Sequence, residues 1–229
     1  MEPDQKIEEN EEIPPEPSIE IRFLCMKLRY WWYLILFLQH TLVVWMIGCL
    51  GTRRWVRQGD DETEWEGGLF YVETGWPQIS GESYYKLKDK SSLDNEQTKD
   101  TFKNLYSAAE AYTFFELLSL IFLTVWMIRV AFHLMEKRFC KNWVSYLWPS
   151  FGFFCHLLGL LIWAGVSDSG YDADCKDVSD KKVCCTNGPT LSVLTCLLWI
   201  FYGSIYIFIF LHRNGIEVYE EKDVEVEKE

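Results

Sequence analysis

The chain has 229 residues, enough for one domain of ordinary size, and carries a formal net charge of -12. That acidity argues against a nucleic-acid partner, because phosphate binding needs a basic surface. The mean hydropathy of -0.06 resembles that of a soluble protein, but long apolar runs alternate with charged stretches, and many of the 11 Trp and 12 Tyr flank those runs. Aromatic rings in that position are typical of the headgroup layer, so the pattern indicates a membrane protein.

Residues 1–21 form an acidic N-terminal segment that contains Pro14, Pro15 and Pro17 and has no apolar pattern. Such a segment cannot bury enough apolar surface to offset its ordering entropy, so we expect a disordered cytoplasmic tail. The segment has no apolar stretch with a cleavage site, so the first membrane span is expected to act as an uncleaved insertion signal.

Four apolar runs are long enough to cross a hydrocarbon core, which needs about 20 helical residues. They cover residues 30–50, 112–134, 147–166 and 190–211, and the loops between them are 51–111, 135–146 and 167–189. The sequence therefore predicts an all-α membrane protein, a four-transmembrane-helix bundle over residues 22–212 with a small extracellular antiparallel β-sheet. An acidic cytoplasmic tail at 213–229, which we also expect to be disordered, completes the chain.

Basic residues near the spans predict the orientation, because cytoplasmic loops are enriched in Lys and Arg. One side carries Arg22, Lys27, Arg29, Lys137, Arg138, Lys141 and Arg213, whereas the other carries Arg53, Arg54 and Arg57, with Lys176, Lys181 and Lys182 farther into the last loop. The balance predicts cytoplasmic termini in the plasma membrane. Cys25 and Cys140 would then lie beside basic residues on the cytoplasmic face, where each is a candidate for S-palmitoylation or an inert thiol.

The first loop contains three runs rich in Trp, Tyr, Val and Phe, at 52–58, 68–75 and 82–88, which are separated by Gly and Pro. Runs of this kind predict the strands of a small antiparallel sheet. Beyond Asn95, apolar residues recur at helical spacing and continue without a breaker into the second span, so we expect one helix that projects past the membrane.

The last loop contains Cys175, Cys184 and Cys185, and clustered thiols favour an oxidising, extracellular compartment. We expect Cys175 to pair with Cys184 or Cys185, which leaves the third thiol to pair between chains or to stay reduced. In the spans near this loop, Gly159, Ala164, Gly165, Gly203 and Ser204 are expected to permit close helix packing.

The first loop also contains Trp55 followed by Gly68, Leu69 and Phe70. With four spans and a large first outer loop, this pattern resembles the Trp…Gly-Leu-Trp signature of claudins, peripheral myelin proteins and the gamma subunits of voltage-gated calcium channels. The resemblance implies cytoplasmic ends and a first outer loop that folds as a sheet. The chain departs from the family in lacking the two cysteines that follow the signature. From the residues themselves, Trp55, Leu69 and Phe70 are expected to pack beneath the sheet rather than to contact a partner directly.

Ionisable residues within spans are functional candidates, because burying them in lipid is costly. His40 and His156 have comparable depth, so they could meet inside the bundle and serve a proton path, or each could be a neutral His hydrogen-bonded between helices. Glu116 could pair within the bundle or reach outer water. Arg129 and His133 are expected to reach the cytoplasmic interface.

No catalytic, cofactor-binding or metal-binding motif appears, so we expect no enzyme activity, no cofactor and no metal site. The partners expected are the lipid bilayer and other membrane proteins. The leading hypothesis is a claudin-like accessory or regulatory subunit of a membrane channel or receptor complex. A cell-junction or adhesion protein, and a small transporter or proton channel that uses His40, Glu116 and His156, are the alternatives.

Overall fold

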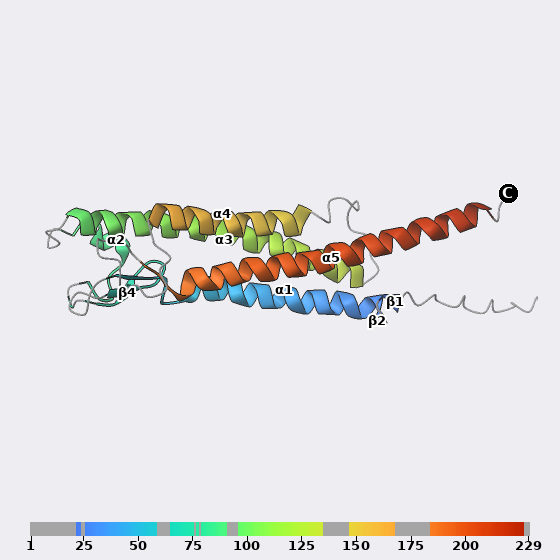
Figure 1. Cartoon of the computed structure of the whole chain (residues 1–229), viewed down its shortest axis with the longest axis horizontal. Helices are drawn as coiled ribbons and strands as arrows, with labels where there is room; N and C mark the ends of the chain where they lie inside the picture. The colour runs from blue at the N-terminus through green and yellow to red at the C-terminus, as the bar shows by residue number, and fades with distance from the viewer. Residues whose placement is uncertain are drawn as a thin grey trace, which may run out of the picture.

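The computed structural model of the chain describes residues 22–23, 26–58, 65–75, 77, 79–90, 96–134, 147–167 and 184–226. Four long helices run side by side, and a small sheet covers one end of the bundle (Figure 1). The predicted tail at 1–21, the loop at 135–146, Cys25, Cys140 and Cys175 lie outside the described residues.

The four helices are α1 (Leu28–Gly51), α3 (Glu96–Leu134), α4 (Leu147–Ser167) and α5 (Asn187–Val226). Each contains a segment long and apolar enough to cross a membrane: Tyr30–Gly51, Lys99–Phe132, Leu147–Ser167 and Asn187–Ile209. The chain is thus a multi-pass membrane protein with a mostly helical fold. The four predicted spans are confirmed as helices, and the continuous helix predicted from beyond Asn95 into the second span is confirmed as α3.

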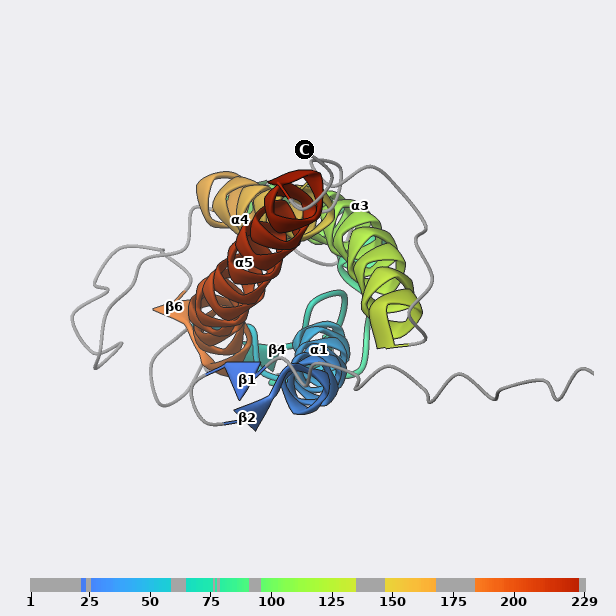
Figure 2. The same ribbon diagram turned by 90° about the vertical axis from the view of Figure 1, so that its right-hand side faces the viewer.

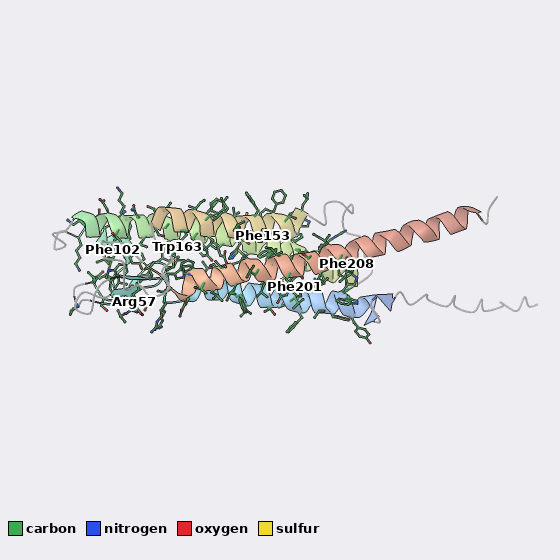
Figure 3. All side chains as sticks on the ribbon, viewed as in Figure 1. Arg57, Phe102, Phe153, Trp163, Phe201 and Phe208 are labelled. Atoms are coloured by element: carbon green, nitrogen blue, oxygen red, sulfur yellow. The ribbon has the colours of Figure 1, made fainter. Side chains whose placement is uncertain are left out.

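All four helices bury residues at alternating spacings of three and four, the spacing of a left-handed helical seam. On α3 the seam comprises Phe102, Leu105, Ala109, Tyr112, Glu116, Ser119, Leu123, Trp126 and Val130, and on α1 it comprises Trp32, Ile35, Gln39, Leu42, Met46 and Cys49. In the view along the long axis, the helices stand around a common interior, with α3 next to α4 (Figure 2). The opposite faces carry exposed apolar side chains such as Phe37, Phe114 and Phe201, as a lipid-facing surface requires (Figure 3).

The sheet has the strand order β5-β4-β3-β6 and is antiparallel throughout. Its strands are β3 (Val56–Gln58), β4 (Trp65–Gly67), β5 (Val72–Thr74) and β6 (Cys184–Cys185). Because β6 comes from the last loop and pairs with β3 from the first, the two predicted outer loops lie at the same end of the bundle. The short strands β1 (Arg22–Phe23) and β2 (Met26–Lys27) pair at the other end, which is also where α5 finishes (Figure 1).

The first loop contains three strands, as predicted, but their positions in the sequence differ partly from the predicted runs. The run at 52–58 forms a strand only from Val56, and the run at 68–75 only at Val72–Thr74. The run at 82–88 is not a strand: Tyr84–Leu87 forms the helical turn α2, which buries Tyr84 and Leu87 three residues apart. Packing of these two side chains overrides the β-propensity of the run. The strand Trp65–Gly67 takes its place in the sheet.

The last helix continues through the acidic segment that was expected to be disordered, and it ends at Val226. Extending an existing helix avoids the unfavourable nucleation step. The segment is rich in Glu and Lys, which have high helix propensity, and it contains no proline.

Candidate functional site: a polar cluster inside the bundle and an aromatic sheet domain

The centre of the bundle contains a buried pair of ionisable side chains. His156 Nδ1 of α4 lies 2.5 Å from Glu116 Oε2 of α3, and neither side chain is exposed. The other ring nitrogen, His156 Nε2, lies 3.1 Å from the backbone oxygen of Ser192 on α5. The pair thereby joins three of the four helices at one level.

The hydrogen bonds of His156 define the charge of this pair. A carbonyl oxygen can only accept, so His156 Nε2 must carry a proton and donate it to Ser192. The remaining hydrogen bond needs one proton between His156 Nδ1 and Glu116 Oε2, which belongs either to the imidazole or to the carboxyl group. In both arrangements the pair has zero net charge, which suits an apolar surrounding.

Further hydrogen bonds extend this cluster to the fourth helix. The Tyr112 hydroxyl lies 2.8 Å from the Ser192 hydroxyl, and the Cys49 thiol of α1 lies 3.7 Å from the Thr195 hydroxyl. One turn farther along α3, the Ser119 hydroxyl donates to the backbone oxygen of Gly152 at 2.6 Å. We call Cys49, Tyr112, Glu116, His156, Ser192 and Thr195 the polar cluster.

Tight backbone approach holds α4 against its neighbours. A β-carbon on Gly159 would lie 3.0 Å from Phe115 Cβ, and one on Gly152 would lie 2.6 Å from the ring of Trp199. The Trp199 indole also donates to the backbone oxygen of Pro149 at 3.0 Å. The predicted close packing is therefore confirmed for Gly159.

The remaining predicted small residues do not make close contacts within the bundle. Ala164, Gly165 and Ser204 are exposed, and a β-carbon on Gly203 would have nothing within 4 Å. These residues lie on the faces of α4 and α5 that point away from the interior, so the prediction is wrong for them.

Two other predictions about intramembrane residues are wrong. His40 lies exposed on the outer face of α1, where its Nδ1 is 2.7 Å from the backbone oxygen of Leu36, so it does not meet His156. The neighbouring Gln39 occupies the buried seam instead, because the seam spacing selects residue 39 and not residue 40.

Arg129 is 3% exposed rather than extended to the interface, since it adjoins the seam residue Val130. The side chain of His133 lies outside the described residues.

Trp55 joins the sheet to the bundle. It is fully buried, its indole nitrogen donates to the backbone oxygen of Cys49 at 2.9 Å, and its ring packs edge-on against Tyr112 and Trp163 at 4.7 and 4.9 Å. Two backbone hydrogen bonds to Gly67 and Thr186 tie Trp55 to both loops. The prediction that Trp55 is a packing residue is confirmed.

A second aromatic group fills the space between the sheet and α3. Trp65, Tyr84 and Phe102 pack with ring centroids 5.3 to 6.4 Å apart. The Tyr84 hydroxyl donates to the backbone oxygen of Gly68 at 2.9 Å, and there is no room for a β-carbon on Gly67 next to that hydroxyl. Burial, with a smaller contribution from the negative charge of Glu73, raises the pKa of Tyr84 well above its ordinary value of 10.0.

Gly68, Leu69 and Phe70, which come after Trp55 in the first loop, also lie in this core. Leu69 is 4% exposed, and Phe70 packs against the core while its backbone oxygen accepts from Tyr84. Gly68 is buried, with its backbone nitrogen bonded to Tyr71. The sequence pattern missed Trp65, Tyr84 and Phe102 as the centre of the core, because Trp65 stands in an acidic run.

A group of contacting side chains, in which Tyr85 is exposed and Lys88 and Tyr106 are half-buried, lies at the surface of this domain. Tyr85 is 57% exposed, its ring lies 5.4 Å from that of Tyr106, and Lys88 Nζ lies 4.5 and 5.1 Å from the two ring centroids. The Tyr106 hydroxyl donates to Glu110 Oε1 at 2.6 Å. We call Tyr85, Lys88 and Tyr106 the Tyr85 face.

The structure describes only part of the segment that contains the predicted disulfide. Cys184 and Cys185 form β6, and the half-buried Cys185 packs against the core around Trp55, while Cys175 and the side chain of Cys184 lie outside the described residues. Cys49, Cys155 and Cys196 are free thiols. Over the described ranges, no three His, Cys, Asp or Glu side chains are grouped so that they could hold a metal ion.

Comparison with protein-family models finds no match for this chain, and comparison with curated proteins finds none either. What the geometry itself establishes is a multi-pass membrane protein with a charge-balanced polar cluster inside its bundle and an aromatic sheet domain at one end.

Proposed function

We propose that this protein is a non-enzymatic, claudin-like accessory subunit that binds a larger membrane protein through the Tyr85 face. The single observation that carries the proposal is that the exposed ring of Tyr85 contacts the half-buried Tyr106 and Lys88 on the surface of a domain with a packed core. Tyrosine provides a large contact area with little loss of side-chain entropy, and it is enriched at protein interfaces.

The filled interior of the bundle gives further support to the proposal. The seams of the bundle are filled by large side chains, among them Trp126, Trp199 and Tyr206, which are at most 1% exposed. Such an interior suits a scaffold better than an open pore. The proposal includes a plasma-membrane location, with the sheet domain outside the cell and both termini in the cytoplasm.

The test is co-purification in mild detergent from the native membrane, with the wild-type chain compared with the double variant Tyr85→Ala/Tyr106→Ala. We expect a stoichiometric partner with the wild type and at least tenfold less of it with the variant. Tyr71→Ala is the matched control, because Tyr71 is similarly exposed at 54% but lies outside the Tyr85 face. Retention of the partner by the double variant, or a wild-type chain that purifies alone, would contradict the proposal. A second copy of this chain as the only partner would favour the junction alternative.

A second candidate function is proton transfer through the bundle, and the Glu116–His156 hydrogen bond favours it. A short hydrogen bond between a carboxyl group and an imidazole can pass a proton between two charge-balanced states. His40 takes no part in this version of the mechanism, since it is exposed on the outer face of α1. Proton flux into liposomes that contain the purified protein tests it: flux that is unchanged in Glu116→Gln and His156→Gln would eliminate the mechanism.

A further inference from the structure

The seam of α1 contains one polar side chain with unmet hydrogen-bonding capacity. Gln39 lies between the apolar seam residues Ile35 and Leu42, and none of its surface is exposed. Within the described part of the chain, neither its amide nitrogen nor its amide oxygen has a hydrogen-bond partner. An amide in this state is costly, and more so inside a membrane, where no bulk water competes.

Other buried atoms on α3 share this property, and two of them belong to seam residues. The indole nitrogen of Trp126 and Glu116 Oε1, the carboxyl oxygen that does not face His156, both lack a hydrogen-bond partner among the residues described. Both side chains are 0% exposed. Glu116 and Trp126 are ten residues apart on one seam, which corresponds to about 15 Å along the helix axis.

Ring contacts and the rise of the helices place Gln39 between those two atoms in depth. Trp32 of α1 and Trp126 of α3 both pack against Tyr206, so they lie at one level. Seven residues, or about 10 Å, separate Trp32 from Gln39 on α1, which runs opposite to α3. The same distance along α3 from Trp126 leads to Ser119, just short of Glu116. Gln39 therefore lies at the depth of the stretch of α3 between Glu116 and Trp126.

We propose that ordered water molecules bind in this seam and link Gln39 to Trp126 and Glu116. The groups are complementary to water: the indole donates, the carboxyl oxygen accepts, and the amide does both, while water offers two donors and two acceptors. Buried waters in proteins characteristically make about three hydrogen bonds to polar groups of this kind. The site gives the Glu116–His156 pair a hydrogen-bonded contact toward the end of the bundle remote from the sheet. It goes beyond the accessory function, which does not require it.

Hydroxyl-radical footprinting in lipid nanodiscs tests the proposal directly, because radicals generated from bound water oxidise the side chains that touch it. Trp126 and Trp55 form a matched pair: both are 0% exposed, but the Trp55 indole has a protein partner, Cys49. We expect Trp126 to be oxidised at least fivefold faster than Trp55. Equal rates for the two residues in the wild-type protein would overturn the proposal, whatever the variants do.

The variant Gln39→Met is an independent test, because the midpoint of thermal unfolding changes in opposite directions with and without bound water. If waters bind, the variant loses their anchor and leaves Trp126 and Glu116 unsatisfied, so the midpoint of thermal unfolding falls by several degrees and the Trp126 oxidation rate drops to that of Trp55. If none bind, the variant removes an unsatisfied amide, and the midpoint rises, which contradicts the proposal. Leu42→Met, one turn farther on the same seam, controls for the change of shape alone.

Discussion

Gly188 and Trp55 are in contact so close that no other residue fits at position 188. A β-carbon on Gly188 would lie 2.5 to 2.7 Å from three atoms of the Trp55 ring. The ring cannot move aside, because Tyr112 and Trp163 pack against it and its nitrogen is bonded to Cys49. The start of α5 is thereby fixed against the sheet.

Gly188→Ala is expected to lower the free energy of unfolding by about 1–3 kcal/mol, the usual cost of overpacking a filled core. Thermal unfolding in detergent, followed by tryptophan fluorescence, measures the loss. Gly203→Ala in the same helix is the control. It meets nothing within 4 Å and should be neutral or stabilise the protein by about 0.5–1 kcal/mol. Equal effects at the two positions would show that the contact with Trp55 is unimportant.

Replacing one member of the Glu116–His156 pair should be far more harmful than replacing both. Glu116→Leu leaves His156 buried without its partner, and we expect a loss of about 3–5 kcal/mol. In Glu116→Gln, the amide can donate to His156 Nδ1 of the neutral imidazole, so the loss should be about 1 kcal/mol. A double-mutant cycle with Glu116→Leu and His156→Leu measures the coupling, and strictly additive losses would contradict a direct hydrogen bond.

The buried phenol of Tyr84 predicts a loss of stability in alkali. Its pKa in the folded protein is raised above the ordinary value of 10.0 by burial, so the unfolded chain releases this proton first. The contribution of the protonated Tyr84 phenol to the free energy of unfolding is thus fully present below pH 10. It declines as the pH rises above that value, by at most about 1.4 kcal/mol per pH unit.

Tyr84→Phe should reduce this alkaline decline while it lowers stability at neutral pH by about 1 kcal/mol, because the hydrogen bond to Gly68 is lost. Denaturation at several pH values between 8 and 11 measures both effects. Tyr71→Phe removes an exposed phenol and should keep the wild-type decline. If Tyr84→Phe declines as steeply as the wild type, Tyr84 is not the group responsible.

The last loop is predicted to contain a disulfide from Cys175 to Cys184 or to Cys185, because clustered thiols favour an oxidising compartment. Peptide mass mapping under non-reducing conditions should find one of these two bridges. Whichever of Cys184→Ser and Cys185→Ser abolishes it identifies the partner of Cys175, and a fully reduced loop would contradict the prediction.

The four membrane-spanning helices could be predicted from the sequence, because the length and composition of each apolar run depend on that segment alone. The helical turn α2 and the extension of α5 to Val226 could not. Apolar runs near the membrane thickness gave the spans, and the absence of a breaker between residues 96 and 134 gave the full length of α3. Trp55, Leu69 and Phe70 could be recognised as packing residues because large apolar side chains beside Gly and Pro turns favour a small core. These properties are local, and a single segment contains all the information needed.

Only the tertiary structure decided which polar groups meet. His40 and Gln39 are neighbours in sequence and differ by one position in helical phase, yet one lies on the outer face and the other lies in the seam. Glu116 and His156, 40 residues apart, become partners because α3 and α4 pack with that register. Likewise, β6 joins β3 across more than 120 residues. The composition of the apolar runs determined that there are four membrane-spanning helices. The helical phase and the register of their packing determined which polar side chains become hydrogen-bond partners.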